Sequence, residues 1–310
     1  MTRRAWAELI GLSAIWGSSY LFISLTLRGF GPFVLVFLRV GLAAAVLAPV
    51  LVRKREVLAG RWHLVPLVAL PQVAIPFVLI SAGEQRIDSG LAGILVATMP
   101  LWLVVLMPLL GLGRPALKAV LGTLTGLVGV VLLLGGIGHG PAPDLLGAGM
   151  VVAAAVCYAI GSAAAKRFMS GVDPVVVTAA TMTAAAVVTA PFAAFEIPSR
   201  LPEPTTLGAL LALALVCTAA AFVLYNRLIA EAGPQRAGLV AYLAPLFAVT
   251  YGAVLLEEPI GVGTFAGLAL ILLGSWLTTR RGRTARTVAV SVETETPLGN
   301  TERSPARPIS

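Results

Sequence analysis

The chain has 310 residues, of which 58% are hydrophobic and 12% charged, and its mean hydropathy is +0.94. A soluble domain carries about 25% charged residues. The composition therefore argues against a soluble protein and indicates an integral membrane protein. The net charge of +8 does not indicate nucleic-acid binding, because the basic residues flank apolar runs and do not form one patch with interleaved aromatic residues.

Apolar runs separated by charged or Pro/Gly-rich breaks predict ten membrane-spanning helices. A helix needs about 20 apolar residues to cross a hydrocarbon core about 30 Å thick. The first run is too long for a signal peptide and lacks a small-residue cleavage site. The predicted spans are 5–26, 31–52, 64–82, 90–110, 116–136, 145–166, 174–195, 206–226, 237–256 and 260–279.

The distribution of positive charge predicts the orientation. If both termini are cytoplasmic, most Lys and Arg residues of the loops fall on the inside, as the positive-inside rule requires. The outside segments then carry only Arg28, Arg86 and Arg200. We therefore expect a multi-pass protein of the cell membrane, with lipid headgroups attracted to the basic segment at 53–63. Residues 280–310 lose the apolar signal and predict a disordered cytoplasmic tail.

The chain contains an internal repeat. Residues 92–134 align with 237–279 without a gap, which pairs Gly122 with Gly267 and Gly129 with Gly274. The predicted fold is all-α, with ten transmembrane helices arranged as two five-helix repeats at 5–136 and 145–279. Five is odd, so the second repeat must be inverted relative to the first. Inverted repeats place substrate sites near the membrane midplane, beside interrupted helices.

Two prolines occupy matching places in this repeat, Pro100 and Pro245. Each lies roughly 12–15 Å into its span at 1.5 Å per residue, and each frees the carbonyl four residues earlier, at Val96 and Ala241. Lipid cannot satisfy a free carbonyl, so it must face protein or a wet cavity. We favour a cavity shaped by two helix breaks, and the alternative is a pair of packing kinks.

The sequence resembles the EamA-type family of the drug/metabolite transporter superfamily over residues 5–279. The resemblance rests on "WGSSYLF", "FLRVGLAAAVLAPVLVRKR", "AGILVATMPL", "AGLVAYLAPLFAVTYGAVLLEEPI" and "FAGLALILLGSWLTTR". The first repeat departs from the family pattern, since it has "LGLGRPAL" where members often carry an acidic turn. The resemblance implies a carrier of small molecules, often an exporter of amino acids or metabolites, without indicating which.

Aromatic and polar residues deep in the spans are the candidates for a substrate site. Trp16 lies roughly 16 Å inside the first span, too deep for an interfacial aromatic belt. It could line a pocket or pack between helices, and the sequence leaves both open. The candidates are Trp16, Ser18, Tyr20, Arg39, Gln72, Met99, Trp102, Tyr158 and Tyr242, with helix breaks at Pro100 and Pro245.

Two of these candidates are polar groups that lipid cannot accommodate. Arg39 is the one clearly intramembrane charge in the sequence, and its cost favours contact with protein or water. Contact with the cargo is the alternative to a structural role, which the resemblance favours. Gln72 lies mid-span in the third helix and should face the bundle, because a buried amide needs a partner.

These features together predict a secondary transporter of a small organic molecule and not an enzyme. A phosphate loop of the GxxxxGK[ST] type is absent, and acidic residues such as Glu84 and Glu258 are expected near the outer face. A channel or a passive scaffold is the alternative function. We expect no cofactor, metal or nucleic acid, and a small-molecule substrate and lipids as partners. A homodimer stays open.

Overall fold

The structure, a computed structural model, describes residues 2–109, 111, 113–134 and 143–279. All regular elements in these ranges are helices, and no strand occurs among them. The predicted disordered tail at 280–310 lies outside the described residues.

Eight helical stretches are long and apolar enough to cross a membrane. Two shorter apolar helices, α13 (Val240–Leu255) and α14 (Val262–Thr279), follow them. Each of the ten predicted spans therefore coincides with a helical stretch. The eight longer stretches are α1 (Arg3–Leu27), α2 (Pro32–Arg53), η2 to α4 (Trp62–Glu84), α5 and α6 (Ser89–Leu106), α7 (Leu117–Leu134), α8 (Leu145–Phe168), α9 (Pro174–Ala193) and α10 to α11 (Pro204–Ala232).

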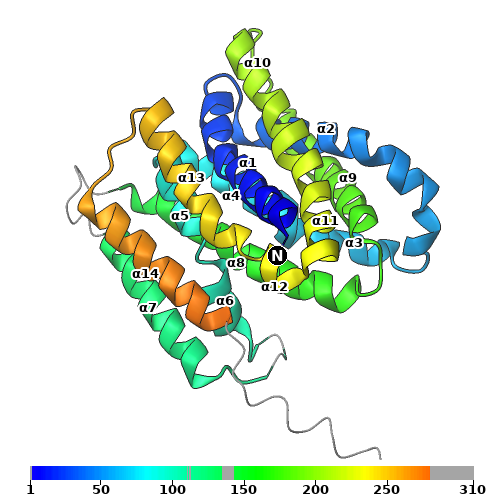
Figure 1. Ribbon diagram of the computed structural model, residues 1–310. Helices are drawn as coiled ribbons and strands as arrows, with labels where there is room; N and C mark the ends of the chain where they lie inside the picture. Colours follow the sequence, from blue (N-terminus) through cyan, green and yellow to red (C-terminus); the bar gives the residue numbers. More distant parts are fainter. Residues whose placement is uncertain (1, 110, 112, 135–142, 280–310) are drawn as a thin grey trace, which may run out of the picture. The chain divides into compact units, whose positions relative to one another are not determined.

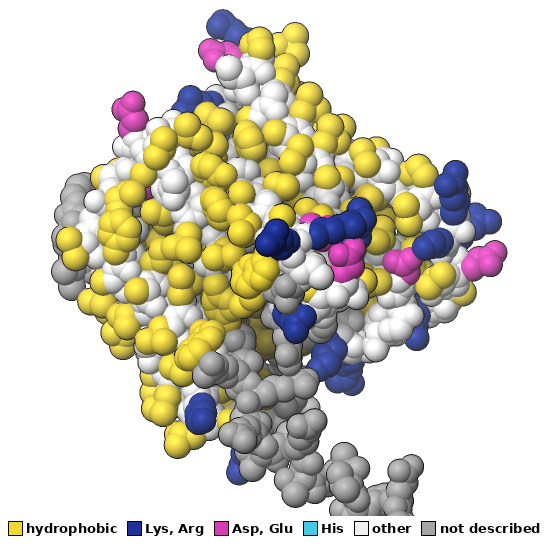
Figure 2. Space-filling model, viewed as in Figure 1, with side chains coloured by type: hydrophobic (Ala, Val, Ile, Leu, Met, Phe, Trp, Pro, Cys, Tyr) yellow, Lys and Arg dark blue, Asp and Glu magenta, His cyan; other side chains and the backbone are white. Residues whose placement is uncertain are grey.

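The outward faces of the helices are apolar, as a lipid environment requires. Leu117, Val128 and Val131 on α7 are 73%, 54% and 68% exposed. Hydrophobic side chains cover most of the face shown in Figure 2, where Lys and Arg gather in a few groups. A large exposed apolar surface marks a membrane or protein contact, and the exposed Leu and Val residues along the length of α7 favour the membrane.

Helices α7 and α14 lie side by side (Figure 1) and meet through glycines. A Cβ atom on Gly122 would lie 2.7 Å from the Gly274 carbonyl oxygen, and one on Gly129 would lie 2.7 Å from the Gly267 carbonyl oxygen. The residue numbers rise on one helix as they fall on the other, so the pair is antiparallel. Small residues let membrane helices approach closely, so the glycines of both helices form packing surfaces.

Helices α2 and α9 form a second antiparallel pair, and each end of the pair is tied by a polar contact. Lys54 Nζ lies 2.7 Å from Asp173 Oδ2. At the opposite end Glu196 Oε2 accepts the Phe33 N–H at 2.8 Å. A carboxylate there satisfies an unpaired backbone donor and complements the positive helix N-terminus.

Two spans contain π-helical segments that the sequence analysis did not predict. The segment η3 (Leu70–Ala74) separates α3 (Val65–Ala69) from α4 (Ile75–Glu84), and η4 (Ala212–Ala220) separates α10 (Pro204–Leu211) from α11 (Ala221–Ala232). Pro71 and Pro76 lack the N–H groups that a regular α-helix would use, which explains η3. The η4 sequence has no proline. Such segments often mark functional sites.

The fourth and ninth spans are interrupted, although only one interruption lies at its proline. Residues Ala97 and Thr98 separate α5 (Ser89–Val96) from α6 (Met99–Leu106), and Pro100 is the second residue of α6. Pro245 instead lies inside α13. The helical interruption comes earlier, at 238–239, after the short α12 (Pro234–Ala237). The prediction of a break at Pro245 is therefore displaced by more than one turn. One missing N–H removes a single ladder bond, which a neighbouring helix can tolerate.

Candidate functional site

A buried arginine lies where helices from both halves of the sequence meet. Arg39 on α2 is 6% exposed. Its Nε–H donates a hydrogen bond to Thr218 Oγ1 on η4 over 2.8 Å, and its guanidinium carbon lies 4.0 Å from the centre of the Phe77 ring on α4. A central arginine costs about 2.5–3.5 kcal/mol on insertion scales, and these contacts offset part of that cost. The bond through Nε leaves two terminal amino groups for other partners.

The π segment η4 presents Thr218 to this arginine. The Thr218 hydroxyl donates to the Leu213 carbonyl, five residues earlier, over 2.8 Å. The hydroxyl thus uses its proton within η4 and keeps its lone pairs for the guanidinium. Sequence reasoning missed Thr218, because nothing in "ALALVCTAA" signals a π segment.

Four of the predicted site residues gather here. The side chains of Tyr20 and Tyr158 lie within electrostatic range of Arg39, and both lie against the same hydrophobic cluster. Ser18 Oγ lies 3.6 Å from the Sγ of Cys217, the residue that precedes Thr218 in the chain. We name this group the Arg39 centre, and its members are Ser18, Tyr20, Arg39, Tyr158 and Thr218.

Two other predicted residues lie in helix contacts. The Trp16 ring packs 5.7 Å from the Phe222 ring and 5.0 Å from the Tyr225 ring, measured between centroids. Gln72 lies on η3 against Gly161 of α8. A Cβ atom added to Gly161 would lie 2.7 Å from the Gln72 Cβ. These positions fit helix packing, and Gln72 faces the bundle as predicted.

The remaining predicted residues lie near the two interruptions. Trp102 Nε1–H donates to Thr98 Oγ1 over 3.1 Å. Tyr242 O–H donates to the Ser275 carbonyl over 3.1 Å, and the Ser275 hydroxyl donates to the Ala97 carbonyl over 3.2 Å. Met99, the first residue of α6, is half-buried. The structure thus links the two interruptions through Ser275 on α14, which the sequence analysis did not single out.

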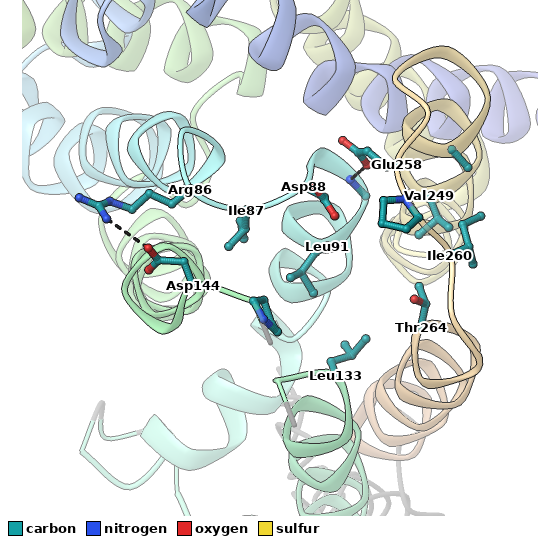
Figure 3. Close-up of a pocket in the computed structure, with 14 residues that line it drawn as sticks. Arg86, Ile87, Asp88, Leu91, Leu133, Asp144, Val249, Glu258, Ile260 and Thr264 are labelled. Carbon is teal, nitrogen blue, oxygen red and sulfur yellow. Dashed lines mark hydrogen bonds and ion pairs between the residues drawn. The ribbon is translucent and has the colours of Figure 1, made fainter. Parts of the chain in front are cut away.

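A pocket with a volume of about 350 Å³ is lined by none of the residues of the Arg39 centre (Figure 3). Its lining comes from the α4–α5 turn with the start of α5, the end of α7, the start of α8, and α13 with the connection to the start of α14. None of the predicted site residues lines it or a second, more open pocket of about 290 Å³ beside η4. Binding by those residues stays a prediction. The labelled lining residues are Arg86, Ile87, Asp88, Leu91, Leu133, Asp144, Val249, Glu258, Ile260 and Thr264.

Two acidic residues of this pocket accept backbone hydrogen bonds. Glu258 accepts the backbone N–H groups of Ser89 at 2.7 Å and Gly90 at 2.9 Å, and so caps α5. Asp144 accepts the Gly147 N–H at 3.0 Å and pairs with Arg86 at 3.2 Å. The Gly147 N–H and then the Arg86 guanidinium hold the pKa of the Asp144 carboxyl below its ordinary value.

The fold and the buried site together define a multi-pass helical membrane protein. The EamA-like transporter family matches residues 6–135 and again residues 145–280. The chain belongs to the EamA-like transporter family, which confirms the resemblance inferred from the sequence.

Several proteins resemble this chain over most of its length. An uncharacterized transporter of Archaeoglobus fulgidus is 23% identical to this chain, and the alignment covers 90% of this chain and 99% of that transporter. The uncharacterized inner membrane transporter YedA of Escherichia coli K12 is 29% identical, with 87% of this chain and 90% of YedA covered. A protein of known crystal structure is 28% identical in sequence and superposes with a TM-score of 0.63, and the match covers 88% of this chain and 96% of the other chain. These relatives support a membrane transporter.

Proposed function

We propose that this protein is a secondary transporter that exports a small organic molecule by alternating access between two inverted five-helix repeats. The repeats comprise residues 5–136 and 145–279, both termini are cytoplasmic, and the protein resides in the cell membrane. The observation that carries the proposal is the Arg39 centre, because Arg39 of the first repeat bonds Thr218 of the second over 2.8 Å. Substrate sites at repeat interfaces are typical of such carriers.

Contacts between equivalent helices support the inverted arrangement. The sequence repeat pairs Gly122 with Gly267 and Gly129 with Gly274, whereas the close contacts join Gly122 to Gly274 and Gly129 to Gly267. Exchanging the two repeats therefore converts one contact into the other. A two-fold relation between antiparallel helices has this property, which supports an axis lying in the membrane plane.

The two π segments support the same relation. Residues 70–74 of η3 correspond to 215–219 at the offset of the repeat, and these lie inside η4 (Ala212–Ala220). Irregular helices at corresponding positions of both repeats suit elements that bend as the repeats move. The breaks at 97–98 and 238–239 correspond less closely and differ by one turn.

The proposed substrate is small, with an apolar or aromatic part and an anionic group. Tyr20 and Tyr158 provide apolar ring surfaces, and the terminal amino groups of Arg39 can donate to a carboxylate. Trp16, Gln72, Met99, Trp102 and Tyr242 are proposed to shape the path around this centre.

Uptake into vesicles tests the proposal. Purified protein would first be screened with amino acids and aromatic metabolites for a rise in melting temperature, since a ligand of the folded state stabilises it by RT ln(1 + [L]/Kd). The stabilising compound should then enter proteoliposomes with saturable kinetics, and Tyr158→Ala should reduce that flux. Flux that rises linearly with concentration would favour a channel, and the absence of protein-dependent flux would favour a scaffold.

A further inference from the structure

Glu84 has a buried carboxyl group that meets no hydrogen-bond donor in the part of the chain that the structure describes. It is the last residue of α4 and is 9% exposed. Both of its carboxylate oxygens are inaccessible and have no partner among the described residues. The hydroxyl of Ser81, one turn earlier on the same helix, is also buried and has no partner there. The sequence analysis placed Glu84 near the outer face and did not foresee its burial.

Charged and titratable groups surround Glu84 on the elements that pack against α4. Arg39 of α2 and Tyr20 of α1 lie within electrostatic range on the side of the Arg39 centre. Tyr158 comes from α8, which also packs against α4. Glu258 lies within electrostatic range from the α13–α14 connection and lines the pocket of Figure 3. Glu84 therefore lies within electrostatic range both of the proposed substrate site and of a carboxyl group that lines the pocket.

The pocket side carries further charges that bear on this carboxylate. Asp88 and Arg86 follow Glu84 in the α4–α5 turn, and Asp144 comes from the start of α8. The Arg86 guanidinium is paired with Asp144 at 3.2 Å, so it is not available as a dedicated partner for Glu84. Arg39 is the cation that lies within electrostatic range of Glu84 among the described residues.

Glu84 and Glu258 differ in the hydrogen-bond donors that their side chains meet. Glu258 accepts two backbone N–H groups at 2.7 and 2.9 Å. Glu84 is buried and meets no donor among the described residues, and burying an ionised carboxyl group without a donor costs far more than burying the neutral acid. Arg39 opposes this preference, but its Nε–H is bound to Thr218 and no hydrogen bond joins it to Glu84.

We propose that Glu84 is the proton-binding group of the transport cycle. It holds a proton in the conformation described here, and the proton leaves to water through the pocket when that end of the bundle opens. The O–H bond of the carboxylic acid breaks, water takes the proton, and the carboxylate left behind is attracted to Arg39. This coupling role rests on the proposed transport function, whereas the proton site itself does not.

Infrared spectroscopy of the protein in lipid tests the proton site without any substrate. At neutral pH the wild type should show the C=O band of a protonated carboxylic acid, and the band should shift when glutamate is labelled with ¹³C. Glu84→Gln should remove the band. Glu56→Gln makes the same change at an exposed glutamate and should keep it. A wild type without the band, or a Glu84→Gln variant that retains it, would overturn the proposal.

If Glu84→Gln does not fold, the ¹³C-labelled wild-type sample still tests whether a glutamic acid is protonated at neutral pH, and Glu84→Asp provides a second variant. In the wild type, a labelled glutamic-acid band at neutral pH supports the proposal and its absence refutes it. In Glu84→Asp, the band should lose its sensitivity to glutamate labelling. These readings need no flux, so a protein that transports nothing would refute the transport function and leave the proton site intact. If a substrate is found, a pH gradient should drive wild-type flux and fail to drive it in Glu84→Gln.

Discussion

The Ser275 hydroxyl donates a hydrogen bond to the Ala97 carbonyl over 3.2 Å, from α14 to the interruption between α5 and α6. Leu101 N–H binds the Thr98 carbonyl at 2.8 Å, which takes it out of the regular ladder to Ala97. The side chain of Ser275 therefore supplies the partner that the helix does not. The same residue accepts from Tyr242 O–H through its carbonyl, so one position on α14 ties both interrupted spans.

Replacing either proline should separate helix stability from transport. Pro100 occupies the second position of α6, where the N–H would be unpaired in any case, so Pro100→Ala should change the melting temperature little. Pro245 lies inside α13, and alanine there should restore a bond to Ala241, a gain of up to about 3 kcal/mol in soluble hosts. Flux should fall in both variants. Wild-type flux in both variants would show that the prolines bend the helices for packing and do not shape a cavity.

Arg39→Lys should lower the stability of the folded protein. An ammonium cannot reproduce both the Nε–H bond to Thr218 and the flat contact with Phe77. Hydrogen bonds of charged groups contribute about 1.5–3 kcal/mol, so a fall of several degrees in melting temperature is expected, with a modest fall in flux per folded molecule. Thr218→Val removes the acceptor at nearly constant shape and should lower stability less. Normal stability of Arg39→Lys with abolished flux would contradict the structural role and leave the arginine with contact to the cargo alone.

The glycine contact of α7 with α14 should not accept a methyl group. A Cβ on Gly122 would lie 2.7 Å from both the Gly274 carbonyl and the Leu277 Cβ, and overpacking of this kind costs about 1–3 kcal/mol. Gly149→Ala on α8 is the matched control, because no atom lies within 4 Å of the added Cβ. Thermal unfolding in detergent compares the two. An equal effect of both substitutions would contradict the close approach.

Asp144 should contribute stability that disappears in acid. Its pKa is lowered in the folded protein by the Gly147 N–H and by Arg86, so the contribution is present above the unfolded value of about 3.9 and is lost as pH falls through the folded value. Asp144→Asn should flatten the dependence of melting temperature on pH in this acidic range. Glu56→Gln, at an exposed glutamate, should retain the wild-type slope. A slope unchanged in Asp144→Asn would show that the pairing has no role.

Much of the fold could be predicted from the sequence, because lipid leaves few choices. Long apolar runs must be helices, and each predicted span coincides with one. The π segments were not predictable in full, since "ALALVCTAA" carries no proline or glycine signal. The site was predicted in part. Arg39, Tyr20 and Tyr158 are near one another, but the burial of Glu84 depends on how α4 faces its neighbours, which a single sequence does not reveal.

The capping role of Glu258 illustrates the same limit. The second repeat contains the acidic turn "LLEEPI" within a segment that resembles the family, yet the partners of Glu258, Ser89 and Gly90, are distant from it in sequence. Because the acidic turn of the second repeat caps a helix of the first, the contact becomes visible only once the repeats are placed together. The first repeat lacks an acidic turn at the corresponding place, so the sequence offers no second cap equivalent to that of Glu258.

Labelling of one central position from both sides of the membrane tests alternating access most directly. In a Tyr158→Cys variant with Cys157 and Cys217 replaced by alanine, a membrane-impermeant maleimide would be applied to right-side-out and to inside-out vesicles. The account predicts that Cys at position 158 reacts in both orientations and that a bound substrate slows both reactions. Reaction from one side alone, or from neither side, would contradict alternating access at this centre.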